Sequence, residues 1–136
     1  MTSCIISSAA YFYVRSLEFA LVSCAVGIFI DLDHFVDYFL NHKFSLKLKE
    51  IYRACDSLDL KKLYVVLHSY ELAALLWLAI YLLSLPLMWS AVALGMTQHL
   101  IFDQITNPIT ARGYFLLYRI FKRFNTADLV VHERAL

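Results

Sequence analysis

The sequence has few of the residues that interrupt or cross-link a chain. Its 136 residues include three glycines, two prolines and three cysteines. So little glycine and proline excludes a collagen-like, low-complexity or linker-rich protein. The cysteines (Cys4, Cys24 and Cys55) are odd in number and form no C-x-x-C pair. This pattern predicts neither a disulfide framework nor a thiolate zinc site.

Charged residues are also scarce, and neither sign dominates. They make up 17% of the chain, against about 25% in an ordinary soluble domain. Hydrophobic residues make up 61%, and the mean hydropathy is +0.64. The net charge of +1 gives no indication of nucleic-acid binding. The composition predicts a small integral membrane protein, and we expect residues 1–136 to form one membrane-embedded domain.

Apolar segments of the length that a bilayer requires occur three times. A bilayer core needs about 20 mainly apolar residues per helix. We expect membrane spans at about residues 17–40, 63–85 and 87–107. Pro86 predicts a tight turn between the second and third spans, and Asn107-Pro108 predicts the end of the third.

Two further segments fit the membrane interface. Residues 112–124 are basic and aromatic, the pattern of a helix that rests on lipid headgroups. Its candidate headgroup contacts are Arg112, Arg119, Lys122 and Arg123. The alternative is a helix that is solvated or packed against a partner. The apolar stretch 4–14 either extends the first span or lies in the interface. The expected fold is all-α: a helical bundle of about three spans with one or two interfacial helices.

The distribution of basic residues predicts the orientation. With three spans, the loop 41–62 and the C-terminal tail lie on the same side of the membrane. The loop holds six of the 12 Lys and Arg residues and the tail five, which leaves only Arg15 for the other side. The positive-inside rule then places loop and tail in the cytoplasm and the N-terminus outside. A multi-pass protein of the inner (plasma) membrane is expected.

Ionisable residues inside spans are costly and indicate functional sites. Here they form three clusters, which are Asp31, Asp33, His34 and Asp37; His68, Ser69 and Glu71; and His99 and Asp103. The first lies where span one reaches the cytoplasm, the second where span two leaves it and the third where span three returns. The topology therefore predicts that all three lie at one depth and form one site.

The spacings in these clusters suit metal ligands. His99 and Asp103 are separated by four residues, as are Asp33 and Asp37, so each pair shares a helix face. Imidazole and carboxylate ligands without thiolates favour Zn²⁺, with Mn²⁺ or Fe²⁺ as alternatives. We expect one or two divalent ions. The predicted ligands are Asp31, Asp33, His34, His68, His99 and Asp103.

Other cluster residues fit more than one role. His34, Asp37 and Glu71 are each suited to ligation, to orienting a ligating imidazole or to general acid–base catalysis. We take Glu71 and Asp37 as the candidate acid–base residues and Ser69 as a hydrogen-bond donor to phosphate. The structural alternative is that these polar groups form interhelical hydrogen bonds that hold the bundle together.

Three motifs together resemble those of a known family. An apolar helix ends in D-x-D-H (Asp31, Asp33, His34), His68-Ser69 opens a later helix, and His99-x-x-x-Asp103 precedes a short polar turn at 104–107. This pattern resembles the membrane-bound metal-dependent hydrolases, including the LexA-regulated inner-membrane type of bacteria. That family is similar to zinc-dependent phospholipase C and the S1/P1 nucleases. The resemblance implies metal-dependent hydrolysis of a phosphoester.

The favoured function is therefore a membrane-bound metal-dependent hydrolase. Its expected partners are membrane lipid and a phospholipid-like substrate, which the basic loop (Lys47 and Lys49 among others) would attract. Nucleic acid is not expected as a partner, and a homo-oligomer is compatible with the sequence. The alternative is a non-catalytic membrane protein, either a metal-binding transporter subunit or an assembly partner.

Overall fold

A computed structural model describes residue 7 and residues 11–41 and 61–131. Within these ranges the chain is helical, without β-strands, and has two isolated bridges, Lys62 with Asn125 and Ile109 with Val130. The prediction of an all-α fold is confirmed. Several residues singled out from the sequence lie outside the described ranges, namely Cys4, Cys55, most of the stretch 4–14 and Lys43, Lys47, Lys49 and Arg53 of the basic loop.

The described residues fall into two compact units, and each unit is made from two separate stretches of chain. The first unit comprises Met1–Ile30 and Tyr70–Asn107, and the second comprises Asp31–Ser69 and Pro108–Leu136. Neither unit is continuous in sequence. The chain therefore cannot be divided by a single cut into two parts that keep their own contacts.

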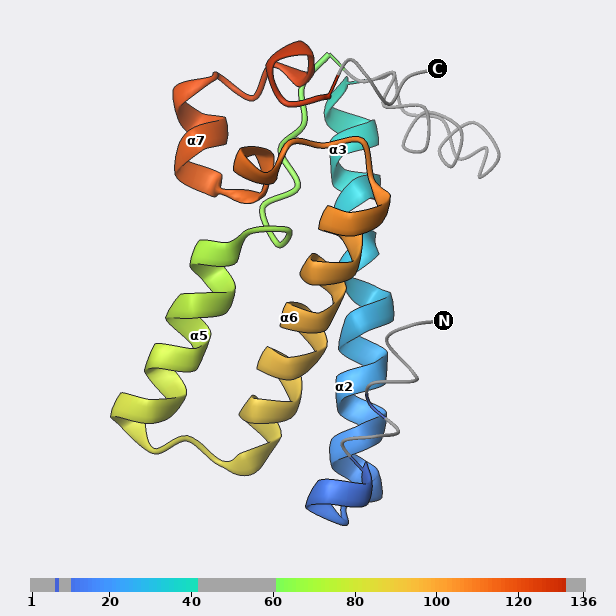
Figure 1. Ribbon diagram of the computed structural model, residues 1–136, viewed down its shortest axis with the longest axis vertical. Coiled ribbons are helices and arrows are strands. Elements are labelled where there is room, and N and C mark those ends of the chain that lie inside the picture. Colours follow the sequence, from blue (N-terminus) through green and yellow to red (C-terminus); the bar gives the residue numbers. More distant parts are fainter. Residues whose placement is uncertain (1–6, 8–10, 42–60, 132–136) are drawn as a thin grey trace. The chain divides into compact units, whose positions relative to one another are not determined.

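The first unit is built from three helices, α2 (Leu17–Phe29), α5 (Tyr70–Leu83) and α6 (Leu87–Thr106). Helix α6 contacts both of the others (Figure 1). Ser16 caps the N-terminus of α2 by accepting a hydrogen bond from the backbone N–H of Phe19. Helix α6 begins after Pro86 and ends before Asn107. The predicted turn and the predicted end of the third apolar segment are both confirmed.

Helices α2 and α6 approach closely because small residues line their contact. A Cβ atom added at Gly95 of α6 would lie 2.5 Å from the backbone oxygen of Ser23 in α2. Beside this point Gln98 donates to Ser7 Oγ at 3.1 Å, and Ser7 donates to Ser23 Oγ at 3.0 Å. All three polar side chains are buried. Small residues and interhelical hydrogen bonds are the means by which helices associate inside membranes.

The second unit contains η1 in part (Ile30–Leu32), α3 (Asp33–Asn41), η2 (Ala111–Tyr114), α7 (Leu116–Phe121) and η3 (Thr126–Asp128). The helix expected at 112–124 is thus divided into η2 and the six-residue α7. Arg119, expected on lipid headgroups, is instead completely buried. Its guanidinium donates hydrogen bonds to the backbone carbonyls of Tyr64, Val65 and His68.

Residues 63–69 differ from the sequence prediction. The hydropathy pattern predicts that they belong to the second span, but they form an irregular segment, and helix α5 begins only at Tyr70. The backbone groups of this segment bond to side chains of α3 and α7 rather than to a helical turn. Tertiary hydrogen bonds here outweigh the apolar character of the sequence, and β-branched Val65 and Val66 have modest helix propensity.

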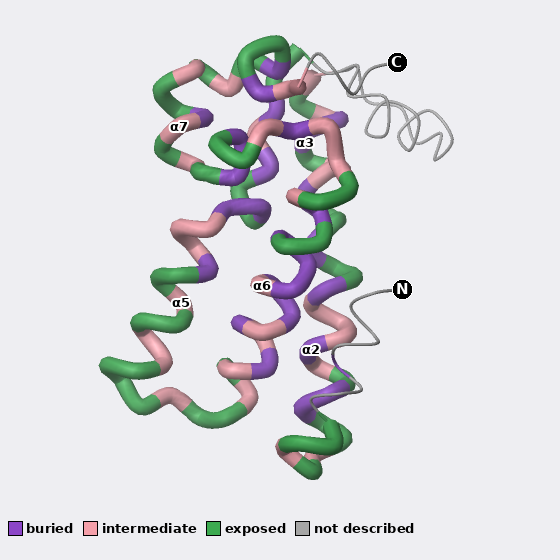
Figure 2. The backbone as a smooth tube through the Cα atoms, viewed as in Figure 1, coloured by how far each residue is buried: buried purple, intermediate pink, exposed green. Residues whose placement is uncertain are grey.

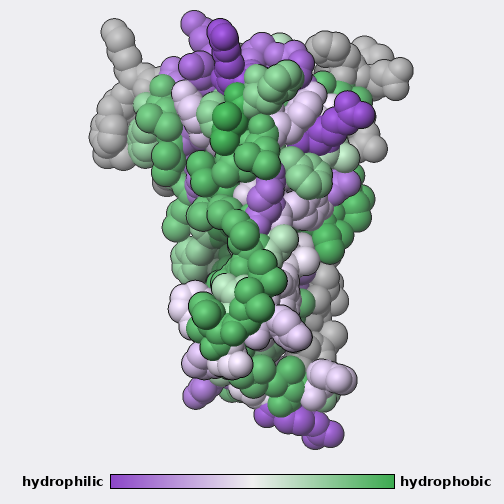
Figure 3. All heavy atoms as spheres, turned by 90° about the vertical axis from the view of Figure 1, so that its left-hand side faces the viewer, coloured by the Kyte–Doolittle hydropathy of each residue, from purple (hydrophilic) through white to green (hydrophobic). Residues whose placement is uncertain are grey.

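One helix of the described chain is long and apolar enough to cross a membrane, the continuous stretch Leu17–Asn41 of 25 residues. Only 28% of its most apolar window is buried, whereas the core helix of a soluble protein is mostly buried. Helix α5 is apolar but has 14 residues, about 21 Å at 1.5 Å per residue. It carries fewer buried residues than α6 (Figure 2). Hydrophobic side chains cover much of the face on which α5 lies (Figure 3).

Cys24 of α2 is disulfide-bonded, which the sequence analysis did not predict. The odd number of cysteines and the lack of a C-x-x-C pair argue against a framework of several bridges. They do not exclude one bridge between cysteines that the fold brings together.

We expect Gly95→Ala to destabilise the first unit, because its methyl group would collide with the backbone of α2. Overpacking of this kind costs about 1–3 kcal/mol, which exceeds the gain of about 1 kcal/mol in helix propensity. Chemical unfolding in detergent, followed by circular dichroism, measures the change. Ala74→Leu, at an exposed position of α5, is the matched control and should leave stability unchanged. Equal stability of Gly95→Ala and the wild type would contradict the close approach.

Candidate metal centre

In the second unit, His68 lies between two carboxylates. Its Nε2 is 3.5 Å from Asp31 Oδ1, and its Nδ1 is 3.6 Å from Asp33 Oδ2. His68 is 3% exposed, whereas the Asp31 side chain is 55% exposed. The imidazole is therefore enclosed by protein, and one of its two carboxylate neighbours is open to the surroundings.

A local change of helix type lets both aspartates face the same imidazole. Asp31 belongs to the 3₁₀ turn η1 and Asp33 begins α3. Residues two apart are separated by about 160° around an α-helix axis but by about 120° in a 3₁₀ helix. The tighter turn thus brings the two side chains nearer to one face. Asp33 is fixed further by accepting a hydrogen bond of 2.6 Å from the backbone N–H of Leu67.

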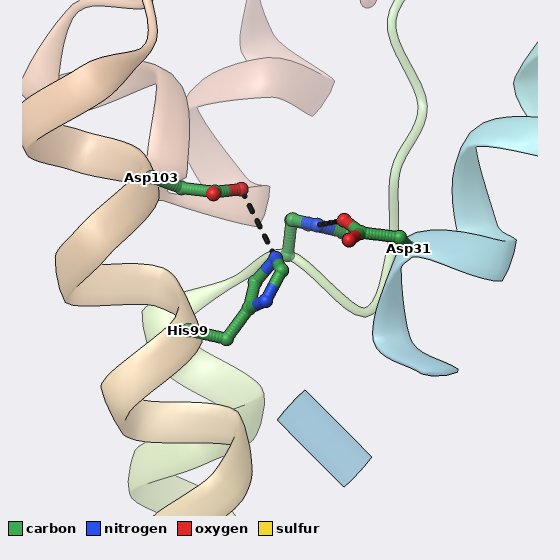
Figure 4. Close-up of side chains that lie close together, drawn as sticks. Asp31, His99 and Asp103 are labelled. Atoms are coloured by element: carbon green, nitrogen blue, oxygen red, sulfur yellow. Dashed lines mark ion pairs between the residues drawn. The ribbon is translucent and has the colours of Figure 1, made fainter. Parts of the chain in front are cut away.

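In the first unit, α6 carries the pair that the i, i+4 spacing predicted. His99 Nε2 is 3.2 Å from Asp103 Oδ2, and Figure 4 shows the two side chains directed toward one another from successive turns. The other ring nitrogen, Nδ1, is 2.7 Å from the carbonyl oxygen of Gly27 in the last turn of α2. Both His99 and Asp103 are buried.

The carbonyl of Gly27 determines the protonation of the His99 ring. A carbonyl oxygen only accepts hydrogen bonds, so His99 Nδ1 must carry the proton in this contact. A neutral His99 then presents the lone pair of Nε2 to the carboxylate of Asp103, and two acceptors face each other. A proton or a cation held between Nε2 and the carboxylate removes this repulsion. Histidines that bind metals commonly donate their other N–H to a carbonyl or carboxylate.

Each unit carries one histidine–aspartate pair that could hold a metal ion, Asp31 with His68 in the second unit and His99 with Asp103 in the first. Each residue offers one ligand atom, an imidazole nitrogen or a carboxylate oxygen. Zn²⁺ binds such N and O donors in four-coordinate sites, and Mn²⁺ and Fe²⁺ accept the same ligands. These residues are four of the six predicted ligands. The other two, Asp33 and His34, lie next to His68: the His34 and His68 ring centroids are 4.8 Å apart.

The three residues predicted to be catalytic differ in burial. Ser69 is completely buried, and Glu71 in the first turn of α5 is half-buried. Asp37 is completely buried, and its two carboxylate oxygens accept hydrogen bonds from the backbone N–H groups of Tyr64 and Val65. Both carboxylate oxygens of Asp37 are therefore engaged by the backbone of residues 64 and 65, which leaves Asp37 poorly placed for proton transfer to a substrate.

Sequence reasoning missed three contributors. The Gly27 carbonyl gives no signal in the sequence, because any residue has a carbonyl. Arg119 donates to the backbone carbonyl of His68 itself, although its basic and aromatic neighbours indicated a lipid-facing side chain. Tyr70 donates to the side chain of Gln104, the residue after Asp103, and its hydroxyl lies 3.5 Å from the carbonyl oxygen of Leu100, three residues before Asp103. Its place directly after His68-Ser69 was its only signal.

Comparisons with known proteins add no relative to this picture. No family model, no curated protein and no solved structure matches the chain.

Proposed function

We propose that the protein is a membrane-bound hydrolase that uses a divalent metal ion to cleave a phosphoester in a lipid or other amphiphile. One observation carries the proposal. In each unit a buried histidine turns Nδ1 toward an acceptor and Nε2 toward an aspartate oxygen. The acceptors are Asp33 for His68 and the Gly27 carbonyl for His99. This is how proteins prepare imidazoles to bind metal through Nε2.

We further propose that the two pairs serve one centre. Gly27, which holds His99, precedes Asp31 by four residues in the continuous stretch Leu17–Asn41. His68 precedes α5, a helix of the same unit as His99, by two residues. These covalent links tether each pair to the other. In this proposal one ion would be held by Asp31, His68, His99 and Asp103, and a second ion would draw on Asp33 and His34.

The residues around such a centre have separate tasks in this proposal. A bound divalent ion acidifies water and offsets the charge that develops on phosphoryl oxygens. Asp33 and the Gly27 carbonyl orient the two imidazoles, as hydrogen-bond acceptors do around bound metals. Glu71 is the candidate to accept the proton of the attacking water, and Ser69 is the candidate donor to a phosphoryl oxygen.

For the membrane arrangement we propose three crossings, with the N-terminus outside and the site at the cytoplasmic boundary. The apolar stretch Leu17–Asn41 and the 11-to-1 division of basic residues support it. The disulfide at Cys24 adds support, because disulfides form on the oxidising side of a membrane and Cys24 lies toward the N-terminal end of the stretch. A substrate that is itself amphiphilic would reach such a site from the bilayer.

Metal analysis tests the shared centre. We expect detergent-purified wild type to hold at least one equivalent of a transition metal, measured by elemental mass spectrometry after reconstitution with Zn²⁺ or Mn²⁺. His68→Ala and His99→Ala should each abolish binding, because each removes a ligand of the same ion. Asp128→Asn, which changes an exposed carboxylate paired with Lys122, is the control and should retain full occupancy. Independent loss of one equivalent in each histidine variant would instead indicate two separate sites.

Hydrolysis is tested with phospholipids in mixed micelles and H₂¹⁸O. We expect ¹⁸O in the phosphoryl product, because water attacks phosphorus, and loss of turnover by about 100-fold or more in Glu71→Gln with metal retained. Removal of metal by a chelator should abolish activity, and added Zn²⁺ should restore it. Stoichiometric metal without hydrolysis of any phosphoester would favour the alternative, a non-catalytic metal-binding membrane protein.

The orientation is tested with reporter fusions in a bacterial inner membrane. We expect alkaline phosphatase to be active when fused within the turn at Ser84–Pro86 and inactive at the C-terminus, because only the turn would face outward. Green fluorescent protein should fluoresce when fused at the C-terminus and should not fluoresce when fused in the turn. Activity of both phosphatase fusions would exclude the proposed topology.

A further inference from the structure

The segment Tyr64–His68, which leads to a proposed metal ligand, is held from two sides by buried charged groups. On one side Asp37 accepts from the backbone N–H of Tyr64 at 2.8 Å and of Val65 at 3.1 Å. On the other side Arg119 donates to the carbonyls of Tyr64, Val65 and His68 at 2.6, 2.7 and 2.8 Å. Five hydrogen bonds from two side chains thus fix this short piece of backbone.

Both charged groups are removed from solvent. The exposed fraction of Asp37 is 0%, and that of Arg119 is 0%. A buried charge is tolerated when opposite charge and hydrogen bonds compensate for its lost hydration. Here the guanidinium and the carboxylate act on each other electrostatically, and the peptide groups of the segment bond to both. Their hydrogen bonds to backbone are charge-assisted and therefore stronger than neutral ones.

The backbone of the segment is strained where the two groups hold it. Val65 has a φ of 27°, in the left-handed region that β-branched residues rarely adopt. Such conformations persist when the surroundings over-determine them, and they concentrate at functional sites. The N–H of Val65 donates to Asp37, and the carbonyl of Val65 accepts from Arg119. The strain is therefore maintained by the same two side chains.

We infer that Arg119 and Asp37 are positioning residues that set the location of the imidazole of His68. The role rests on the proposed function, because it presumes that His68 binds metal. Arg119 Nη2 bonds to the carbonyl of His68 itself, so the guanidinium fixes the backbone from which the ligand extends. Arg119 lies in α7, and the contact joins a C-terminal helix to a residue 51 positions earlier.

Cobalt substitution provides the test, because the d–d absorption of Co²⁺ reports the arrangement of its ligands. We expect Arg119→Lys to keep the buried positive charge but to lose part of the three-carbonyl contact, since an ammonium group lacks the planar fork of guanidinium. At saturating Co²⁺ the spectrum should differ from that of the wild type. The Co²⁺ affinity should fall by about 10-fold to 100-fold, the cost typical of groups that orient a metal ligand.

Arg112→Lys is the matched control, because Arg112 is exposed in the same part of the chain. It should give the wild-type spectrum and affinity. Asp37→Asn is a second variant for use if Arg119→Lys does not fold. It keeps one acceptor oxygen and should also alter the spectrum. The double variant should be little worse than the poorer single variant, because both act on one segment.

The possible failures are distinguishable. Wild type that binds no Co²⁺ would overturn the metal proposal and the positioning role with it. Wild type that binds Co²⁺, with unchanged spectra and affinities in folded Arg119→Lys and Asp37→Asn, would overturn the positioning role alone. Amide hydrogen exchange at Tyr64 and Val65 supplies a readout without metal. It should accelerate in both variants and remain at the wild-type rate in Arg112→Lys.

Discussion

The structure depends on how one irregular stretch of backbone satisfies its polar groups among apolar neighbours. Between the basic loop and α5 the chain is not helical, so its N–H and C=O groups lack helical partners. Backbone polar groups that are buried away from water need such partners, and here side chains supply them. Asp37 and Arg119 supply them from opposite sides. The segment that presents His68 therefore needs both buried charges as hydrogen-bond partners. Its peptide groups in turn compensate the two charges for their lost hydration.

This arrangement explains why elements far apart in the sequence belong to one unit. Helix α7 has only six residues, and Arg119 is its one buried residue, while Leu117, Ile120 and Phe121 are exposed. Its attachment comes from the guanidinium of Arg119, which donates to three carbonyls, and the backbone N–H of Leu63 donates to the carbonyl of Phe124 just beyond the helix. Removing one buried charge would leave the other uncompensated, at a cost of about 3–5 kcal/mol. The C-terminal part of the chain is therefore structurally linked to the ligand segment.

The sequence predicted those features that depend on residues close together in the chain. Hydropathy located the apolar helices, Pro86 and Asn107 marked their ends, and the i, i+4 spacing paired His99 with Asp103. It misassigned residues 63–69, because their conformation depends on side chains more than 20 positions away. Arg119 was assigned to lipid for the same reason. A basic residue beside aromatic residues gives the same local sequence pattern whether it contacts lipid headgroups or buried carbonyls. The pattern alone therefore cannot distinguish the two cases.

The charges of the two histidine–aspartate pairs connect the metal proposal to the apolar composition. Asp103 is buried beside His99, so its charge needs compensation by a proton on one of the two side chains or by a cation. Asp31 is more exposed than Asp103, and water compensates its charge more fully. In the metal proposal a divalent ion would supply the positive charge that the apolar surroundings do not, and its binding would release protons from the ligands.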